Sequence, residues 1–348
     1  MSEDEHDEET INPRSEQDQT SQERSGEKEV IEKDTIPHFF PTYRIKRSFY
    51  PIPIILAVLC AGILAYFSIL AGINIDGGYF SEAEGGALAG LLNGIIFTTM
   101  AVGSAFVMIY FVKKKGIGIL KYVFGFSIGF ITFFQTWFFA EIIMLVIFNL
   151  FPYTENLQLI YNISDYAILV PSIAVLSILL LYKYFTTEKI RVKNFIILYV
   201  SFLTGAILGV IMPLWTTLTI LIGISLWDLF AVLYKKGPIK QMIDLASEDQ
   251  EMDEDLREKI ENGEVEYDTS KLEIGIGDLA FYSMLTSAAL IITSNIIIMI
   301  LVAIAIIIGT GITIQGLKRN KILPGLPISI FLGIATMLIS WGIWIFLV

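Results

Sequence analysis

Long uncharged stretches separated by clusters of lysine and arginine constrain this chain more than any other feature. Of its 348 residues, 54% are hydrophobic, and apolar runs long enough to cross a bilayer recur from residue 51 to the C-terminus. About 20 residues of helix, at 1.5 Å per residue, span the hydrocarbon core. Because backbone groups in a bilayer must bond internally, the pattern predicts an all-α membrane protein.

The basic residues form five clusters, and each interval between clusters has room for two spans joined by a turn. The midpoints of the intervals contain no lysine or arginine. Four hairpins and one terminal run make nine transmembrane helices, and the positive-inside rule places the N-terminus inside and the C-terminus outside. The predicted spans are 51–74, 87–112, 122–150, 164–182, 194–212, 214–234, 274–293, 295–317 and 326–347.

Two polar segments lie outside these spans. Residues 1–45 are predicted to be an acidic, disordered cytoplasmic tail, because about −9 of the net charge of −11 lies in the first 34 residues and these include no aromatic residue. Residues 235–272 are predicted to be a hydrophilic cytoplasmic loop. It separates helices 1–6, in residues 46–234, from helices 7–9, in residues 273–348.

Several kinds of chemistry are excluded by composition. Cys60 is the only cysteine, and the two histidines, His6 and His38, precede the first span. A zinc site built on cysteines and an intramembrane histidine-dependent protease therefore lack their residues. The clusters beside the membrane leave no separate basic face, so nucleic acid is not expected as a partner.

Glycines spaced by four residues recur in three spans and predict close helix packing of the small-xxx-small type. The same spans contain Asn93 and Gln135, which are expected to form hydrogen bonds between helices. The glycine sets are Gly86, Gly90 and Gly94; Gly125 and Gly129; and Gly205 and Gly209.

Two aspartates lie inside otherwise uncharged runs. Asp278 is the only charged residue from Ile274 to Leu317, and Asp228 stands in LWDLFAVL at 226–233. Such a residue costs about 2.5–3.5 kcal/mol on insertion and usually faces a partner or a water-filled cavity. Each aspartate is seven residues from a flanking lysine on the predicted cytoplasmic side, so both carboxylates are expected at one depth.

Two carboxylates at one depth suit aspartyl proteolysis, proton or cation transport, or a structural polar contact. In proteolysis, one carboxylate takes a proton from water and the other, protonated, donates to the scissile carbonyl; the pair shares one proton. Gly275 and Gly277 lack a Cβ and leave room for a substrate strand beside Asp278. A membrane transporter is the alternative, but it favours midplane acids and inverted repeats, whereas these acids lie nearer the inner side and no repeat is found.

Three motifs resemble those of the presenilin family of intramembrane aspartyl proteases. GIGD at 275–278 matches the GxGD signature, and WDLFAVLYKKGPIKQM at 227–242 is similar to the sixth-helix motif, YDLVAVL followed by KGPLRM. LPGLPISI at 323–330 looks like the PALP segment. The motifs follow the family's order and helix plan, and the resemblance extends from about residue 45 to the end. The compact size is similar to that of an archaeal presenilin homologue.

The resemblance implies an intramembrane aspartic endopeptidase with Asp228 and Asp278 as its catalytic pair, water as the nucleophile and no cofactor or metal. Gly325 replaces the alanine of PALP, and Trp227 replaces the usual tyrosine. The substrate-binding and site-organising residues that the resemblance implies are Trp227, Leu272, Ile274, Gly275, Gly277, Pro324, Gly325 and Leu326.

The resemblance also implies partners and a location. The substrates would be single-span membrane proteins, cleaved within the lipid bilayer. The chain is expected to be a multi-pass protein of the cell membrane, specifically of an archaeal plasma membrane. The sequence leaves open whether it forms a homo-oligomer or needs accessory subunits.

Overall fold

The computed structural model describes residues 29–31, 41–116, 118–234, 265–267, 271–317 and 325–347. Most of the predicted tail, most of the predicted loop and Pro324 lie outside the described residues. The chain divides into two compact units. In one unit, β1 (Glu29–Ile31) pairs in parallel with β3 (Val265–Tyr267). The other unit, residues 36–249 and 270–348, contains the elements described below.

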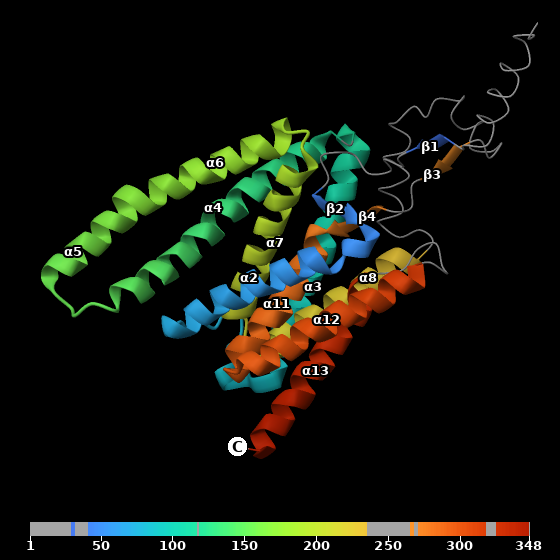
Figure 1. The fold of residues 1–348 in the computed structure, drawn as a ribbon. Helices are drawn as coiled ribbons and strands as arrows, with labels where there is room; N and C mark the ends of the chain where they lie inside the picture. Colours follow the sequence, from blue (N-terminus) through green and yellow to red (C-terminus); the bar gives the residue numbers. More distant parts are fainter. Residues whose placement is uncertain are drawn as a thin grey trace, which may run out of the picture. The chain divides into compact units, whose positions relative to one another are not determined.

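Nine helices in the described part of the chain are long and apolar enough to cross a membrane, as the basic clusters predict. The fourth span is longer than predicted because α5 runs through a π-helical stretch, η3, into α6. Thr154 fixes its start by accepting a hydrogen bond from the Leu157 N–H. The elements in Figure 1 are η2 (Arg47–Phe49), α2 (Pro51–Leu70), α3 (Glu82–Lys115), α4 (Ile119–Phe148), α5 (Glu155–Ile163), η3 (Ser164–Leu169), α6 (Val170–Thr186), α7 (Ile190–Ile211), α8 (Leu214–Leu233), α11 (Ile276–Thr293), α12 (Ile296–Leu317) and α13 (Leu326–Leu347).

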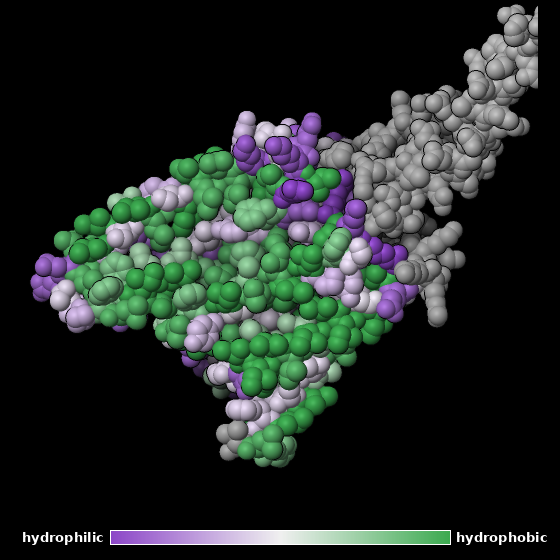
Figure 2. Space-filling view, viewed as in Figure 1, coloured by the Kyte–Doolittle hydropathy of each residue, from purple (hydrophilic) through white to green (hydrophobic). Residues whose placement is uncertain are grey.

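Large apolar side chains cover the outward faces of these helices. Leu88, Phe126 and Ile178 are 65%, 75% and 68% exposed. Figure 2 shows hydrophobic residues over most of the visible helical surface, with hydrophilic residues gathered where α6 meets α7 and beside the strands. Apolar patches of this extent require a nonaqueous neighbour, which fits a multi-pass membrane protein. Which side of the membrane each end faces stays a prediction.

Helix α11 is the most enclosed span and packs against α7, α2, α12, α13 and α8 (Figure 1). All its residues from Tyr282 to Leu290 are buried. A Cβ added at Gly205 of α7 would lie 2.2 Å from the Ala280 carbonyl oxygen, and one at Gly209 would lie 2.6 Å from the Met284 carbonyl oxygen. The predicted close packing at these two glycines is therefore confirmed.

The remaining glycine sets mostly pack as predicted. A Cβ at Gly90 would lie 2.2 Å from Trp215 Cβ, and one at Gly94 would lie 2.3 Å from Thr219 Cβ, so α3 contacts α8 closely. Gly86 is different: its φ is +55°, and an added Cβ would meet nothing within 4 Å. The prediction that Gly86 packs against a neighbour is wrong, and the residue forms a kink in α3. The third set, Gly125 and Gly129, faces Phe185 and Leu181 of α6.

Polar side chains join the helices where the sequence predicts. The Asn93 amide of α3 donates to the Thr216 hydroxyl of α8 at 3.1 Å. The Thr204 hydroxyl of α7 donates to Gln135 Oε1 of α4 at 3.0 Å. Both predicted interhelical contacts are confirmed, and each satisfies a polar group that lipid would leave without a partner.

A second sheet joins two segments far apart in the sequence. Strand β2 (Thr42–Lys46) pairs antiparallel with β4 (Lys271–Gly275), with Thr42 opposite Gly275 and Lys46 opposite Lys271. The prediction of disorder up to residue 45 is wrong for Glu29–Ile31, which form β1, and for Thr42–Ile45, which belong to β2. The seventh span likewise begins at Ile276 rather than 274, because β4 extends to Gly275.

Both strands show the period-two pattern of a half-buried sheet. Tyr43 and Ile45 alternate with charged residues in β2, and Leu272 and Ile274 do the same in β4. Of these side chains, Tyr43, Leu272 and Ile274 pack in the main hydrophobic core or against it, with Ile274 buried. The sheet is thus fixed to the helices on one face.

Candidate active site

Asp278 lies where strand β4 gives way to helix α11. Gly275 is in extended conformation and caps the helix, and Asp278 stands in its first turn. Amide groups of a first turn have no partner within the helix, so an acidic side chain is favoured there. The Asp278 side chain is partly buried there.

Asp228 reaches the same place from helix α8. Its Oδ2 accepts a hydrogen bond from the Leu326 N–H at 3.2 Å. Leu326 is the first residue of α13, whose opening amide groups also lack partners within their helix. The carboxylate of α8 therefore fixes the start of α13.

Gly325 and Leu326 bring the two aspartates together. A Cβ added at Gly325 would lie 3.2 Å from Asp278 Oδ2, and the next residue, Leu326, donates to Asp228. Both carboxylates therefore lie beside the same dipeptide. Three helices, α8, α11 and α13, thus converge on one pair of acidic groups, as the matched depth of the aspartates predicts.

Tyr282 supports this arrangement from one turn beyond Asp278. Its hydroxyl lies 3.3 Å from the Gly325 carbonyl oxygen and 3.4 Å from Ser329 Oγ, and it donates to one or the other. Ser329 Oγ also lies 3.0 Å from Thr310 Oγ1 of α12. Sequence reasoning missed this network. The available signal was a tyrosine four residues after an intramembrane acid, on the same helix face.

Among the described residues, no neighbouring atom lies so close to Gly275 or Gly277 that only glycine would fit there. A Cβ at Gly275 would lie 3.8 Å from Asp278 Oδ2, and one at Gly277 would lie 3.9 Å from the Phe281 ring. Both are ordinary contact distances. A methyl group would therefore fit at either position without displacing a neighbour.

The other residues implied by the resemblance lie around this pair in different ways. Leu272 and Ile274 point into the core and lie opposite Ile45 and Tyr43 of β2. Trp227 packs its ring against Phe106 of α3 at 5.9 Å and Phe230 of α8 at 5.6 Å. Pro324 is outside the described residues.

Metal ligands are not gathered in the part of the chain that the structure describes. Among those residues, no group of three or more histidine, cysteine, aspartate or glutamate side chains could hold an ion. The chemistry that these residues offer is that of two carboxylates, with backbone N–H groups as donors.

The comparisons with known proteins agree on one family. The family model "Presenilin" matches residues 80–256 and 249–345. Presenilin-B of Dictyostelium discoideum is 37% identical over 149 residues, which are 39% of this chain and 29% of that protein. A presenilin-like protein of Arabidopsis thaliana is 24% identical over 70% of this chain and 76% of its own length. The matched region is less than a third of the Dictyostelium protein.

A solved structure shares the fold. The structure of a presenilin family intramembrane aspartate protease superposes with a TM-score of 0.54 at 14% sequence identity, covering 84% of this chain and 97% of that one. The family model spans most of the sequence and includes both aspartates and the start of α13. The chain belongs to the presenilin family.

Proposed function

We propose that this protein is an intramembrane aspartyl endopeptidase that hydrolyses peptide bonds within transmembrane helices of other membrane proteins. One observation carries the proposal: Asp228 and Asp278, from different helices, meet at the dipeptide Gly325–Leu326. Membership of the presenilin family supports it.

The two carboxylates have different roles in this mechanism. Asp228 accepts the Leu326 N–H, and such a bond stabilises an ionised carboxylate; Asp228 is therefore the general base. It takes a proton from water as the water oxygen attacks the scissile carbonyl carbon. Asp278, protonated, donates its proton to the carbonyl oxygen. The proton held by Asp228 then passes to the amide nitrogen. As the C–N bond breaks, a hydroxyl proton of the tetrahedral intermediate returns to Asp278, which leaves a carboxylic acid and an amine as products and restores the singly protonated pair. No cofactor takes part.

The pair works only when it holds a single proton. Without a proton it has no donor for the carbonyl, and with two it has no base for water. The cleavage rate should therefore pass through a maximum with pH, and its two limbs belong to the pair rather than to either residue.

The substrate must be extended before it can react. A helical peptide bond is sterically shielded and internally hydrogen-bonded, whereas the space beside Asp278 adjoins a strand, β4. Added strands bind through backbone hydrogen bonds at a free sheet edge. We propose single-span membrane proteins whose helices unwind readily near the inner leaflet, entering with the N-terminus outside.

The proposed orientation has the N-terminus inside and the C-terminus outside. The Lys121 ammonium group lies over the Phe185 ring at 5.6 Å, and Asn194 bonds the backbone of Arg44. The basic residues near the start of α4, the end of α6, the start of α7 and β2 therefore share one end of the helices. The positive-inside rule makes that end cytoplasmic.

A purified protein and a single-span reporter in detergent test the function. In water enriched in ¹⁸O, mass analysis should find a new C-terminal carboxylate that has incorporated one heavy oxygen, from a bond within the reporter's helix. Replacing Asp228 or Asp278 with asparagine should abolish the product. If no product forms and the aspartates instead control proton or cation flux in vesicles, the protein is a transporter.

A further inference from the structure

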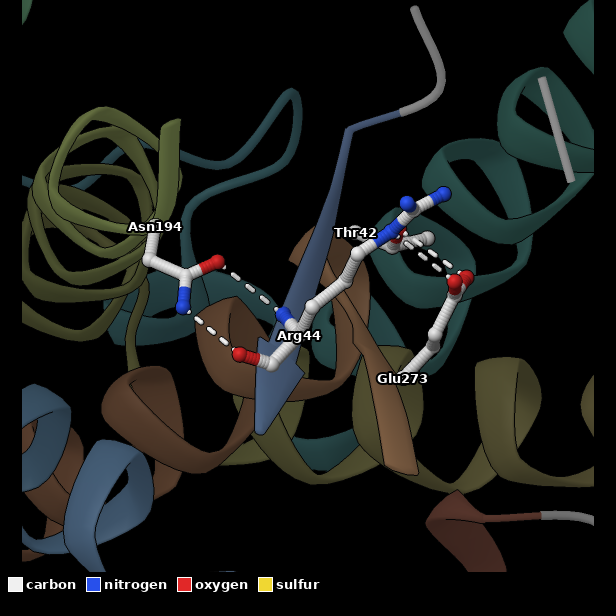
Figure 3. Close-up of polar contacts among 4 residues, drawn as sticks. All are labelled: Thr42, Arg44, Asn194 and Glu273. Carbon is white, nitrogen blue, oxygen red and sulfur yellow. Dashed lines mark hydrogen bonds and ion pairs between the residues drawn. The ribbon is translucent and has the colours of Figure 1, made fainter. Parts of the chain in front are cut away.

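Strand β2 is held along both of its edges. One edge pairs with β4. On the other, the Asn194 side chain at the start of α7 accepts the Arg44 N–H at 3.0 Å and donates to the Arg44 carbonyl at 2.7 Å (Figure 3). A side-chain amide that bonds both backbone groups of one residue imitates a neighbouring strand. Asn194 therefore completes the outer edge of β2.

The alternation of hydrogen bonds along the β2–β4 pair shows which backbone groups of β4 have no partner in β2. The ladder begins with the Ile276 N–H donating to the Pro41 carbonyl at 3.2 Å. Because bonded pairs alternate in an antiparallel ladder, Ile274 and Leu272 also direct their backbone groups toward β2. The backbone groups of Gly275 and Glu273 then point to the opposite edge. Arg44 lies opposite Glu273, and its backbone groups likewise point away from the partner strand, toward Asn194. The alternation therefore agrees on both strands.

The open edge of β4 thus ends beside the aspartate pair. No described strand pairs with it. Its Gly275 is three residues before Asp278, and an added Cβ there would lie 3.8 Å from Asp278 Oδ2. An extended peptide bound here would run directly into the carboxylates.

Side chains across the sheet reinforce the same pairing. Arg44 Nε lies 2.9 Å from Glu273 Oε1, and the Thr42 hydroxyl donates to Glu273 Oε2 at 3.1 Å (Figure 3). The Arg44 and Glu273 side chains are only 19% and 27% exposed, so solvent screens the ion pair less than it screens a pair on an open surface.

Strand β2 is fixed rather than exchangeable. Three residues of η2 follow it directly, and the Arg47 guanidinium donates to the Ile314 carbonyl of α12. Its Tyr43 side chain packs against the main hydrophobic core. A segment anchored at both edges, on one face and at its end is suited to support another strand.

We infer that β2 is a permanent part of the substrate site, and that Asn194, Arg44 and Glu273 are positioning residues that keep the open edge of β4 extended for the substrate. The inference rests on the proposed function. Reporter helices dock before they unwind, so KM reports docking, while kcat reports strand addition and hydrolysis. Loosening β2 should therefore lower kcat and leave KM nearly unchanged.

Four variants test this: Asn194→Leu, Arg44→Glu, Glu273→Arg and the double exchange of Arg44 and Glu273. Leucine keeps the branched shape of asparagine, though it is larger, and forms neither hydrogen bond. We expect kcat to fall about tenfold in each single variant, the scale of one or two lost hydrogen bonds. KM should stay within about twofold. The double exchange should recover most of the loss, which a general loss of folding would not do. Asn162→Leu, an exposed position on α5, is the control.

Hydrogen–deuterium exchange of residues 271–276 without substrate gives a readout that needs no activity. We expect exchange about tenfold faster in Asn194→Leu and unchanged exchange in Asn162→Leu. The inference would be overturned if Asn194→Leu kept both the wild-type kcat and the wild-type rate of hydrogen–deuterium exchange. It would also be overturned if the variant with Arg44 and Glu273 swapped were no more active than the single variants. If the wild type cleaves nothing, the proposed function fails. The hydrogen–deuterium exchange of residues 271–276 alone then decides whether Asn194 holds the sheet.

Discussion

Replacing Gly205 with alanine should push α11 away from α7 and disturb the aspartate pair. The added Cβ would lie 2.2 Å from the Ala280 carbonyl oxygen, 2.3 Å from Ser283 Cβ and 2.8 Å from the Met284 nitrogen, where ordinary contacts are 3.4–4 Å. All three neighbours are backbone atoms or a Cβ, so no flexible side chain can yield. The helices must separate locally by more than 1 Å.

The expected loss follows from that displacement. Overpacking of this kind destabilises a protein by about 1–3 kcal/mol, which corresponds to a fall in Tm of about 2–12 °C. Asp278 lies in the first turn of the displaced helix, and a misplacement of about 1 Å can lower a rate about a hundredfold. Cleavage should therefore fall at least tenfold, even at temperatures where the variant is folded.

Thermal unfolding in detergent and reporter cleavage measure the two effects together. Gly103→Ala is the matched control, because Gly103 is an exposed glycine of α3 and an added Cβ meets nothing within 4 Å. Alanine there should be neutral or stabilise by up to about 1 kcal/mol. Equal Tm and equal cleavage for Gly205→Ala and Gly103→Ala would refute the close contact between α7 and α11.

Three further predictions concern the site and the topology. Gly325→Ala places a methyl group 3.2 Å from Asp278 Oδ2, so cleavage should fall less than tenfold. Gly325→Leu should abolish cleavage, and equal cleavage rates for the two variants would contradict the contact. Tyr282→Phe removes the hydroxyl beside the Gly325 carbonyl and should lower kcat about threefold to tenfold, while Tm should fall by only a few degrees. An unchanged kcat would contradict the positioning role of the Tyr282 hydroxyl. In a Cys60→Ser background, a cysteine placed at 245–265 should resist an impermeant reagent on intact cells, and labelling there would reverse the proposed orientation.

The helical architecture could be predicted because its causes are local in the sequence. Uninterrupted apolar runs and basic clusters indicate the spans directly, and Asp228 and Asp278 stand out because a charge inside such a run is costly. Their approach to Gly325 and Leu326 was implied only by the order of the three motifs. The electrostatic exclusion of charge from lipid is therefore what makes the site visible in the sequence.

The supporting sheet could not be predicted with the same means. Strands β2 and β4 are five residues each, too short for their alternation to stand out beside long apolar helices. Their pairing depends on two contacts between distant residues, Arg44 with Glu273 and Asn194 with the Arg44 backbone. Single residues of these types are common near membrane surfaces, so only the fold reveals that they meet.

Gly86 shows a second limit. Its spacing from Gly90 and Gly94 predicts a shared packing face, yet its positive φ bends α3 where nothing packs against it. Spacing alone does not distinguish a glycine needed for close approach from one needed for its backbone conformation.

The most direct test of the central claim compares Asp228→Asn, Asp278→Asn and the double variant in cleavage of one reporter. If the aspartates act as one unit, each single variant should keep less than about a hundredth of the wild-type rate, and the double variant should lose no more than either single one. Tm should stay near the wild-type value in all three, because asparagine keeps the shape of the side chain. A single variant that retains more than a hundredth of the rate, or losses that multiply in the double variant, would contradict the two-aspartate mechanism.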